Sequence, residues 1–337
     1  MTAGGVPLQV SGVGHYVPDR LVTNDELAPL LGTTPAWIAD RSGIQERRFA
    51  APGQSNADLA LHASRRALAQ AGIEADALGM ILVATLSPDH FFPGVSAELQ
   101  AGLGLARPVP AFDLHAQCSG FLYGLAVAKG LLLAEAYEHV LVAGSELQSA
   151  GLDFSPRGCQ TSMLFGDGAG AVVLSRRPDE GPRRFVVELF SDGRFARELW
   201  MEAPGAALPP HRMTPEDLSA GRCFPSMNGK NVILHATRKL AHAARAVLDR
   251  AGLTPDDVDW IIPHQANLNL LTGLERALGV SPGKVVINIA RVGNTSAASI
   301  PIALSEAVAA GQVRRGQRIL MLGFGSGFAW GGCLLEY

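Results

Sequence analysis

One long internal duplication restricts the fold of this chain more than any other feature of its sequence. The segment ALAQAGIEADALGMIL, residues 67–82, resembles AVLDRAGLTPDDVDWII, residues 246–262. Gly72 and Gly252 are equivalent positions in the two segments, at a separation of 252 − 72 = 180 residues, and neighbouring matches keep that separation. Arrays of short repeats have periods of roughly 20–50 residues, so one repeat of this length indicates two copies of a larger plan.

The segments that follow the first match also correspond. The strand, turn and apolar helix of residues 113–134 have a counterpart in residues 285–310, and the apolar strand at 140–146 has one at 319–327. Strands that alternate with helices predict an α/β fold built in layers. Two halves of the same plan therefore predict two packed sheets that share a buried layer of helices.

The predicted boundaries give an N-terminal half of residues 1–176 and a C-terminal half of residues 184–337. They are joined by RRPDEGPRR, residues 176–184, a charged segment rich in Pro and Gly that is typical of a linker. The shared layer is expected to consist of the two apolar, Ala-rich helices that follow Cys118 and Asn294. A helix that is apolar all round is expected to be buried on every side.

The composition describes a well-buried protein and argues against several classes of partner. Of the 337 residues 47% are hydrophobic, and a net charge of −3 offers no basic surface for nucleic acid. No uncharged apolar run reaches the length of a membrane span, and the N-terminal residues lack the features of a signal peptide. The four cysteines lack the CxxC spacing of zinc sites, so we expect no metal and a reducing, cytoplasmic location.

A glycine pair near the N-terminus does not predict a nucleotide site. Gly12 and Gly14 could begin a dinucleotide-binding fingerprint, but the third glycine is missing and Pro18 follows. The fingerprint requires its glycines between a strand and a helix. A nicotinamide-dependent dehydrogenase is therefore a distant alternative.

Cys118 stands at the start of the first central helix, and two interpretations apply to it. A free cysteine most often packs as a small apolar residue. At the first turn of a buried helix, however, unpaired backbone N–H groups and the positive end of the helix dipole favour a thiolate. The sequence around Cys118 alone leaves both interpretations open.

Two further motifs lie at equivalent places, where strands end and turns begin. His264 follows the strand DWII, and Asn294 precedes the second central helix. Taken singly, His264 could be a polar loop residue and Asn294 a helix cap. Since ligands gather at the carboxyl ends of strands in α/β sheets, the two residues could also meet Cys118 and support a nucleophile. Cys159, Cys223 and Cys333 are predicted to be packing residues.

Five segments together make the chain resemble the thiolase superfamily, and specifically the ketoacyl-acyl carrier protein (ACP) synthase III group of condensing enzymes. The resemblance covers essentially all 337 residues. The segments are DLHAQCSG at 113–120, FGDGAG at 165–170, PHQAN at 263–267, GNTSAAS at 293–299 and GFGSGFAWG at 323–331. It implies a thiolase-like, five-layered αβαβα fold. The segments TLSPDH and AQCSGFLYGL look closer to secondary-metabolism members, such as the quinolone-signal ketosynthase.

The resemblance implies a decarboxylative Claisen condensation in fatty-acid or secondary-metabolite biosynthesis, of the polyketide or quinolone type. Cys118 would carry an acyl group taken from acyl-CoA or acyl-ACP. Backbone N–H groups of Cys118 and Ser326 would form the oxyanion hole. His264 and Asn294 would donate hydrogen bonds to a malonyl (or β-ketoacyl) thioester, of CoA or ACP, and so stabilise its enolate. The thioesters are substrates, and no other cofactor is implied.

The resemblance also assigns residues at the substrate entrance. Trp37, Arg41 and Arg157 match positions that hold the adenine end of CoA, and Phe92 matches a residue that walls the acyl pocket of the partner in a homodimer. At Asn269 the family often has an arginine linked to docking of the acyl carrier protein, so this chain departs from the pattern there.

Two further functions remain open at this stage. The acyl group on Cys118 could pass to a hydroxyl or amine, or two acyl chains could be joined, as in variants of the same superfamily. The chain could instead be a non-catalytic acyl-binding protein, although intact Cys118, His264 and Asn294 argue against that.

Overall fold

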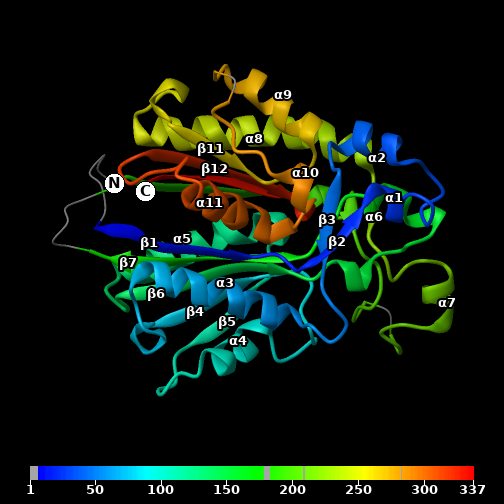
Figure 1. Ribbon diagram of the computed structural model, residues 1–337, viewed down its shortest axis with the longest axis horizontal. Coiled ribbons are helices and arrows are strands. Elements are labelled where there is room, and N and C mark those ends of the chain that lie inside the picture. The colour runs from blue at the N-terminus through cyan, green and yellow to red at the C-terminus, as the bar shows by residue number, and fades with distance from the viewer. Residues whose placement is uncertain (1–6, 178–182, 208, 282) are drawn as a thin grey trace.

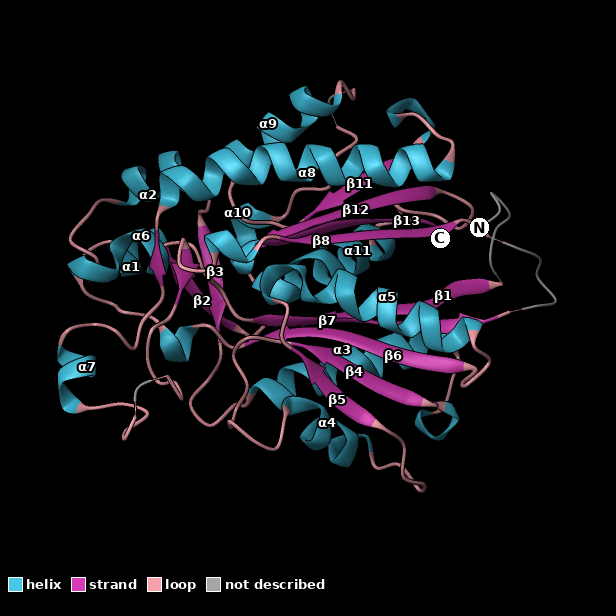
Figure 2. Ribbon diagram, turned by 180° about the vertical axis from the view of Figure 1, so that it is seen from behind, coloured by secondary structure: helices cyan, strands magenta, loops and turns pink. Residues whose placement is uncertain are grey.

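The computed structural model describes residues 7–177, 183–207, 209–281 and 283–337. The middle of the predicted linker, residues 178–182, lies outside the described residues. Two mixed sheets form the frame of the molecule (Figures 1 and 2). The first has the strand order β1-β7-β6-β4-β5 and the second the order β11-β12-β13-β8.

Nine strands make up these two sheets. Those of the first sheet are β1 (Leu8–Tyr16), β4 (Met80–Ala84), β5 (Ala111–Leu114), β6 (His139–Glu146) and β7 (Gly168–Arg176). Those of the second are β8 (Phe185–Ser191), β11 (Trp260–Pro263), β12 (Arg318–Gly325) and β13 (Ala329–Glu336). In the first sheet β4 pairs in parallel with both β5 and β6, and in the second β11 pairs in parallel with β12.

Helices cover the outer faces of both sheets and fill the space between them (Figure 2). The outer helices are α3 (Asn56–Ala71) and α4 (Val95–Leu103) on the first sheet, and α8 (Gly229–Ala251) and α9 (Leu268–Leu278) on the second. The central layer contains α5 (Gly120–Leu133) and α11 (Ser299–Ala309). The order of layers is therefore αβαβα, as predicted.

The remaining helices and strands lie mostly at one end of the two sheets. They are α1 (Asn24–Leu27), α2 (Pro35–Ser42), α6 (Cys159–Ser162), α7 (Pro215–Ser219), α10 (Ile289–Val292) and the short strand pairs β2 (Arg20–Thr23) with β3 (Glu46–Phe49) and β9 (Leu199–Trp200) with β10 (Ser226–Met227).

The duplication is visible in equivalent backbone contacts. Ile81 of β4 pairs with Ala111, and Ile261 of β11 forms a parallel bridge with Val285. The helices before these strands end in the same way, because Gly72 and Gly252 both cap them in the left-handed conformation, which glycine adopts without a steric penalty.

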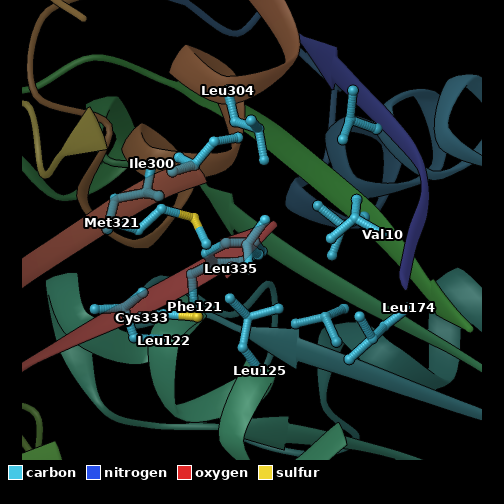
Figure 3. Packing of buried hydrophobic residues seen from close by; sticks show 14 of the residues in the cluster. Val10, Phe121, Leu122, Leu125, Leu174, Ile300, Leu304, Met321, Cys333 and Leu335 are labelled. Carbon is cyan, nitrogen blue, oxygen red and sulfur yellow. The ribbon is translucent and has the colours of Figure 1, made fainter. Parts of the chain in front are cut away.

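The largest apolar cluster lies between the sheets, where the central helices meet both of them (Figure 3). Phe121 and Leu125 from α5 and Ile300 and Leu304 from α11 are almost completely buried there. Each such side chain contributes roughly 1.5–3 kcal/mol through its removal from water. The central layer therefore fixes the starting points of α5 and α11 relative to both sheets.

The prediction that both central helices are buried on every side holds for α11 but is wrong for the end of α5. The helix α11 is buried along nearly its whole length. In contrast, Gly130 and Leu133 at the end of α5 are exposed. Lys129 donates a hydrogen bond to the Phe185 carbonyl at 2.7 Å, which accounts for a charge in this apolar helix.

The glycine pair of β1 has a packing role. A Cβ atom on Gly12 would lie 2.2 Å from the Ala67 carbonyl oxygen, and one on Gly14 would lie 2.3 Å from that of Ala63. Both glycines therefore let α3 lie directly against the strand. This contact explains the pair without a nucleotide.

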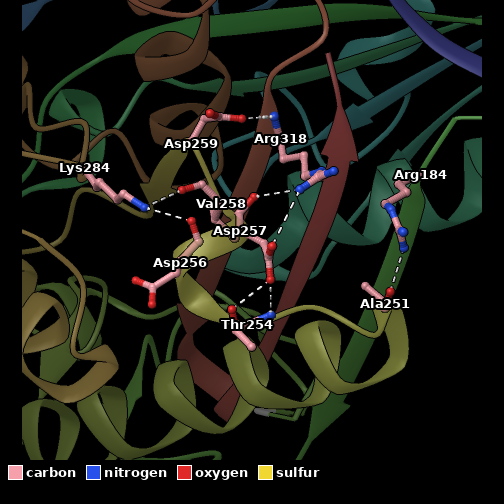
Figure 4. Close-up of polar contacts among 9 residues, drawn as sticks. All are labelled: Arg184, Ala251, Thr254, Asp256, Asp257, Val258, Asp259, Lys284 and Arg318. Carbon is pink, nitrogen blue, oxygen red and sulfur yellow. Dashed lines mark hydrogen bonds and ion pairs between the residues drawn. The ribbon is translucent and has the colours of Figure 1, made fainter.

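Polar contacts fix the start of β11, the strand that leads to His264 (Figure 4). Thr254 and Asp257 form a capping box, in which the Thr254 N–H donates to the Asp257 carboxylate at 2.8 Å. The Arg318 N–H donates to Asp259 at 2.8 Å, and Lys284 donates to the Val258 carbonyl at 2.9 Å. These bonds join β11 to its neighbours at the end opposite the candidate site.

Candidate active site

Cys118 lies in a 3₁₀ turn, η2 (Gln117–Ser119), that joins β5 to α5. The residue before it, Gln117, has a φ of 47°, a left-handed conformation that non-glycine residues seldom adopt. Gly325 at the end of β12 packs against the same turn, because a Cβ atom there would lie 2.9 Å from the Cys118 nitrogen. Cys118 is therefore held at the place where the two halves touch, and is only 6% exposed.

The equivalent turn of the second half, η8 (Ser296–Ala298), faces Cys118. Ser296 has the same φ of 47° as Gln117, and its hydroxyl donates a hydrogen bond to the Cys118 Sγ at 3.5 Å. The two residues are 178 positions apart in the sequence. The duplicated turns thus meet face to face and build the centre of the site together.

Asn294 is fixed by its backbone and by its side-chain oxygen. Its N–H donates to the Leu164 carbonyl at 2.8 Å, and its carbonyl accepts from the Gly166 N–H at 3.0 Å. Its Oδ1 accepts a hydrogen bond from the Ser296 N–H at 2.9 Å. The N-cap of η8 is Thr295 rather than Asn294, so the bond to the Ser296 N–H is a local turn contact. It leaves the Asn294 amide NH₂ as the group that can donate to a ligand.

His264 follows β11 directly, and its N–H donates to the Leu322 carbonyl at 2.7 Å. Its Nδ1 lies 2.6 Å from the hydroxyl of Ser299, the first residue of α11. That hydroxyl oxygen also accepts from the Gln265 N–H at 3.4 Å, so its own proton can go to Nδ1. Burial lowers the pKa of His264 to about 4, so the imidazole is neutral at pH 7 and can carry its proton on Nε2.

One short segment connects all three predicted residues. Ser296 touches Cys118 and Asn294, and Ser299, three residues further along, touches His264. The structure therefore brings the cysteine, the histidine and the asparagine to one place. The serines of GNTSAAS do this work, and their roles were not predicted from the sequence.

The surroundings of the Cys118 thiol hold its proton more tightly than water does. Burial raises the pKa of the Cys118 thiol to about 11, and the Glu146 carboxylate adds to that effect, although the hydrogen bond from Ser296 opposes it. Burial therefore opposes the thiolate that a helix start favours. The proton must leave Cys118 when a substrate arrives.

Glu146 is a third residue whose place in the site was not predicted from the sequence. It ends β6, is fully buried, and accepts a hydrogen bond from the Ser87 hydroxyl at 2.6 Å. Its other oxygen accepts from the Ala297 N–H of turn η8 at 3.3 Å. The available signal was an acid at the end of the apolar strand HVLVAGSE, because an unpartnered charge is seldom buried without a reason.

Two of the residues predicted for the substrate entrance, Trp37 and Arg41, are in contact. The guanidinium of Arg41 lies 5.4 Å from the ring centre of Trp37 on the same face of α2. Arg157 follows Pro156, which packs on Gly32 in the loop before α2. The Arg157 Nε donates to the Asp153 carboxylate at 2.7 Å. Arg41 thus places its guanidinium over the Trp37 ring, and the turn that contains Arg157 packs against the loop before the same helix.

Phe92 lies on the outside of the chain, 79% exposed, beside Phe91 at 66%. Both precede α4 in the loop that follows β4. This loop and the edge strand β5 line a hollow that includes Phe91, Phe112 and His115. Phe92 is therefore directed away from the interior of its own chain.

Ser326, the other residue predicted for the oxyanion hole, directly follows Gly325 and so lies close to turn η2.

The other three cysteines are free thiols, and Cys333 is fully buried in the central cluster. Among the described residues, no group of three or more His, Cys, Asp or Glu side chains is arranged to hold a metal ion. None of the helices in the described ranges is both long and apolar enough to cross a membrane.

Comparison with known proteins places this geometry in a family. Residues 112–193 match the family model for 3-oxoacyl-[acyl-carrier-protein (ACP)] synthase III, and residues 248–337 match the model for the C-terminal part of that synthase. The first match includes Cys118, and the second includes His264 and Asn294.

Individual relatives are similar to this chain over nearly its whole length. A β-ketoacyl-[acyl-carrier-protein] synthase III of Laribacter hongkongensis is 44% identical, over 98% of this chain and 99% of that protein. The crystal structure of the corresponding synthase of Aquifex aeolicus has a TM-score of 0.88 at 36% identity, and covers 99% of this chain and 100% of that one.

A third relative comes from secondary metabolism. It is the priming β-ketosynthase of the R1128 polyketide pathway, with a TM-score of 0.88 at 33% identity, and it covers 100% of this chain and 98% of that one. The particular likeness to the quinolone-signal ketosynthase stays a prediction. The agreement in sequence, in fold and over full length shows that this chain belongs to the β-ketoacyl-[acyl-carrier-protein] synthase III family of condensing enzymes.

Proposed function

We propose that Cys118, His264 and Asn294 carry out the Claisen condensation that is typical of this family, in fatty-acid biosynthesis. The observation that carries the assignment is that Ser296 and Ser299 tie all three residues into one buried site. Transfer of the acyl group to a hydroxyl or amine, the joining of two acyl chains and a purely acyl-binding role are not needed to explain the chain. A polyketide-type starter stays a prediction.

In the first half-reaction, Cys118 attacks an acyl thioester and becomes acylated. The backbone N–H groups of Cys118 and Ser326 would bind the oxyanion that forms. The tight packing of Gly325 against the Cys118 backbone supports this pair, because it leaves no side chain between the two segments. Each donor of this kind contributes about 3–4 kcal/mol to the stability of the transition state.

In the second half-reaction, a malonyl thioester loses CO₂ and its carbanion attacks the acyl group on Cys118. His264 would donate from Nε2 and Asn294 from its amide NH₂ to the thioester oxygen of the enolate. The low pKa of His264 supports a donor role. An imidazole that stays neutral has one N–H, on Nε2, to donate, and it is a weak base toward a further proton.

At the entrance, Trp37 and Arg41 would stack on and pair with the nucleotide end of CoA, together with Arg157. Arg157 already has partners, because it donates to the Ser219 carbonyl at 2.9 Å and to Asp153. It would therefore present its remaining edge to the ligand. The thioesters are the substrates, and the absence of any further cofactor stays a prediction, as does a cytoplasmic location.

The acyl carrier protein would be the partner that delivers the malonyl group. Asn269 cannot supply a cation for this docking, and its side chain instead donates to the Arg41 carbonyl at 3.4 Å. It thereby holds α9 against the end of α2. We propose that basic residues elsewhere at the entrance, such as Arg41, contact the acidic carrier.

We also propose a homodimer in which β5 pairs with its copy. β5 is an edge strand, and edges with exposed apolar residues tend to pair with another chain. The exposed Phe91, Phe92 and Phe112 support this interface, and Phe92 would reach the acyl pocket of the partner. Within each chain, residues 1–176 and 184–337 would be the two halves of the duplication.

Intact-protein mass spectrometry tests the proposed function. Cys118 should gain the mass of an acyl group from one or more of a panel of short, long and aromatic acyl-CoA and acyl-ACP thioesters, and Cys118→Ala should gain none. Malonyl-ACP or malonyl-CoA should then release CO₂ and remove the acyl mass. If no donor acylates the wild-type protein, or if acylated protein releases no CO₂, the proposal fails.

A further inference from the structure

The carboxylate of Glu146 is buried beside the nucleophile, and its surroundings are unusually rich in donors. Its Oε2 accepts from the Ser87 hydroxyl at 2.6 Å, the Gln148 amide at 3.0 Å and the Leu86 N–H at 3.2 Å. These groups fix one carboxylate oxygen in place. They do not use the other oxygen, Oε1, which is directed toward turn η8.

The Ser296 hydroxyl lies between Glu146 and Cys118. It donates to the Cys118 Sγ at 3.5 Å, and the same side chain lies beside the Glu146 carboxylate, where it lowers the pKa of that carboxyl against the larger rise caused by burial. Ser296 itself is completely buried, and the Ala297 N–H binds the same carboxylate at 3.3 Å. Sulfur, hydroxyl and carboxylate therefore form a continuous chain of groups that can pass a proton.

Electrostatics gives this chain of groups a direction. Burial raises the pKa of both the Cys118 thiol and the Glu146 carboxyl. With Glu146 ionised, loss of the thiol proton to water would place two buried negative charges side by side, which is strongly unfavourable. If the proton moves to Glu146 instead, the number of charges in the site stays at one.

We propose that Glu146 takes the proton of Cys118 through the Ser296 hydroxyl when the enzyme is acylated, and returns it after the condensation. This proposal rests on the proposed function, because it assumes that Cys118 is the acyl carrier. It makes Ser296 and Glu146 part of the catalytic machinery.

The protons balance over both half-reactions. In acylation the Ser296 hydroxyl turns its proton from Sγ to Glu146 and accepts the Cys118 proton as its own moves to the carboxylate. The C–S bond to Cys118 forms, and the acyl bond to the sulfur of CoA breaks. The CoA thiolate leaves and takes a proton from water. In condensation malonyl thioester loses CO₂, the new C–C bond forms, and Cys118 departs as a thiolate that recovers the proton from Glu146. One proton is taken up from water in each cycle.

The variant Ser296→Ala removes the connecting hydroxyl and leaves the donors to Glu146 Oε2 intact. Acylation by a donor that the wild-type enzyme accepts should become roughly 10²-fold slower, in the range expected for loss of general base catalysis. The rate is measured as CoA release in a single turnover. Ser119→Ala is the matched control, because Ser119 is an equally buried neighbour of Cys118 whose hydroxyl donates to the Ala329 carbonyl instead.

The pH dependence separates a relay from a structural role. The charged side chain that acts on the thiol is Glu146 from β6, and His264, held at α11, is neutral above about pH 4. Without the relay the thiol must lose its proton to hydroxide, so the acylation rate of Ser296→Ala should rise about tenfold per pH unit from pH 6 to 9. The wild type and Ser119→Ala should vary much less over the same range.

Glu146→Gln gives an independent test. Its amide oxygen can replace Oε2 and keep the donors there, whereas its nitrogen cannot accept a proton. It should show the same slow, pH-dependent acylation as Ser296→Ala, with a thermal midpoint measured alongside to confirm that it is folded. If folded Glu146→Gln or Ser296→Ala is acylated at the rate and with the pH dependence of the wild type, the relay is excluded. Failure of the wild type to be acylated at all would instead overturn the proposed function.

Discussion

Gln117 and Ser296 occupy equivalent places in the two halves of the chain, and both hold the left-handed backbone conformation, with a φ of 47° in each. Non-glycine residues adopt this conformation at a cost, and such strain persists only where the surrounding packing enforces it. Gln117 sets the turn that presents Cys118, and Ser296 sets the turn that faces it. The two turns that face each other in the site therefore have the same backbone conformation, one from each half of the duplication.

Ser299→Ala should impair the malonyl half-reaction more than the acylation. The hydroxyl 2.6 Å from His264 Nδ1 favours the tautomer with a proton on Nε2, and one hydrogen bond is worth about 1 kcal/mol. Decarboxylation of malonyl thioester by acylated enzyme should therefore fall roughly fivefold to tenfold. Ser305→Ala is a suitable control, since it removes a similar contact, to His15, on the same helix. Equal loss in both half-reactions would contradict the assigned role.

The buried, neutral state of His264 should make the folded protein sensitive to acid. Its pKa is lowered from 6.5 to about 4 by burial, so the unfolded chain binds the proton more tightly. The free energy of unfolding that neutral His264 contributes is fully present above the pKa of a histidine in the unfolded chain, 6.5. It is lost as the pH falls from 6.5 to about 4. At 1.36 kcal/mol per pKa unit, the loss approaches about 3 kcal/mol.

Urea unfolding of the wild type and of His264→Gln at several pH values measures this effect. The stability of the wild type relative to the variant should decline between pH 7 and 4, while contributions from buried acids such as Glu146 and Asp167 cancel in the difference. A difference that does not change with pH would show that His264 is not held neutral.

Gly325→Ala should distort turn η2, which carries Cys118. The new Cβ would lie 2.9 Å from the Cys118 nitrogen and 3.1 Å from its Cβ, and overpacking of this kind destabilises proteins by about 1–3 kcal/mol. Acylation of Cys118 should slow at least tenfold, because the displacement affects the proposed oxyanion donors. Gly130→Ala serves as the control, since a Cβ there meets nothing within 4 Å and alanine favours the helix. An unchanged acylation rate in Gly325→Ala would refute this account of the turn.

A charge on the edge strand should prevent dimer formation. Phe112 on β5 is 40% exposed, and Phe112→Asp would place a carboxylate in the proposed apolar interface. Light scattering should give twice the chain mass for the wild type and the single chain mass for the variant. Leu218→Asp, at a 52% exposed position on α7, should remain dimeric. Monomeric wild-type protein would remove the dimer, and with it the role of Phe92 in the pocket of the partner.

The sequence by itself determined the layers and most of the elements. Helix stops at Gly72 and Gly252, apolar strands and the constant separation of 180 residues all depend on local conformation and on periodicity, which are encoded over short stretches. The motifs around Cys118, His264 and Asn294 also indicated the family. For the end of α5 the prediction was wrong, because the composition of a helix does not say which of its faces lacks a neighbour.

Only the tertiary structure decided how the site works. The contact between Ser296 and Cys118 joins residues 178 positions apart, and that between Ser299 and His264 joins residues 35 apart. The state of the thiol depends on burial by strands and turns from both halves and on the charge of Glu146, neither of which is visible next to Cys118 in the sequence. Proton affinity inside a protein is set by distance and loss of water, and both exist only once the chain has folded.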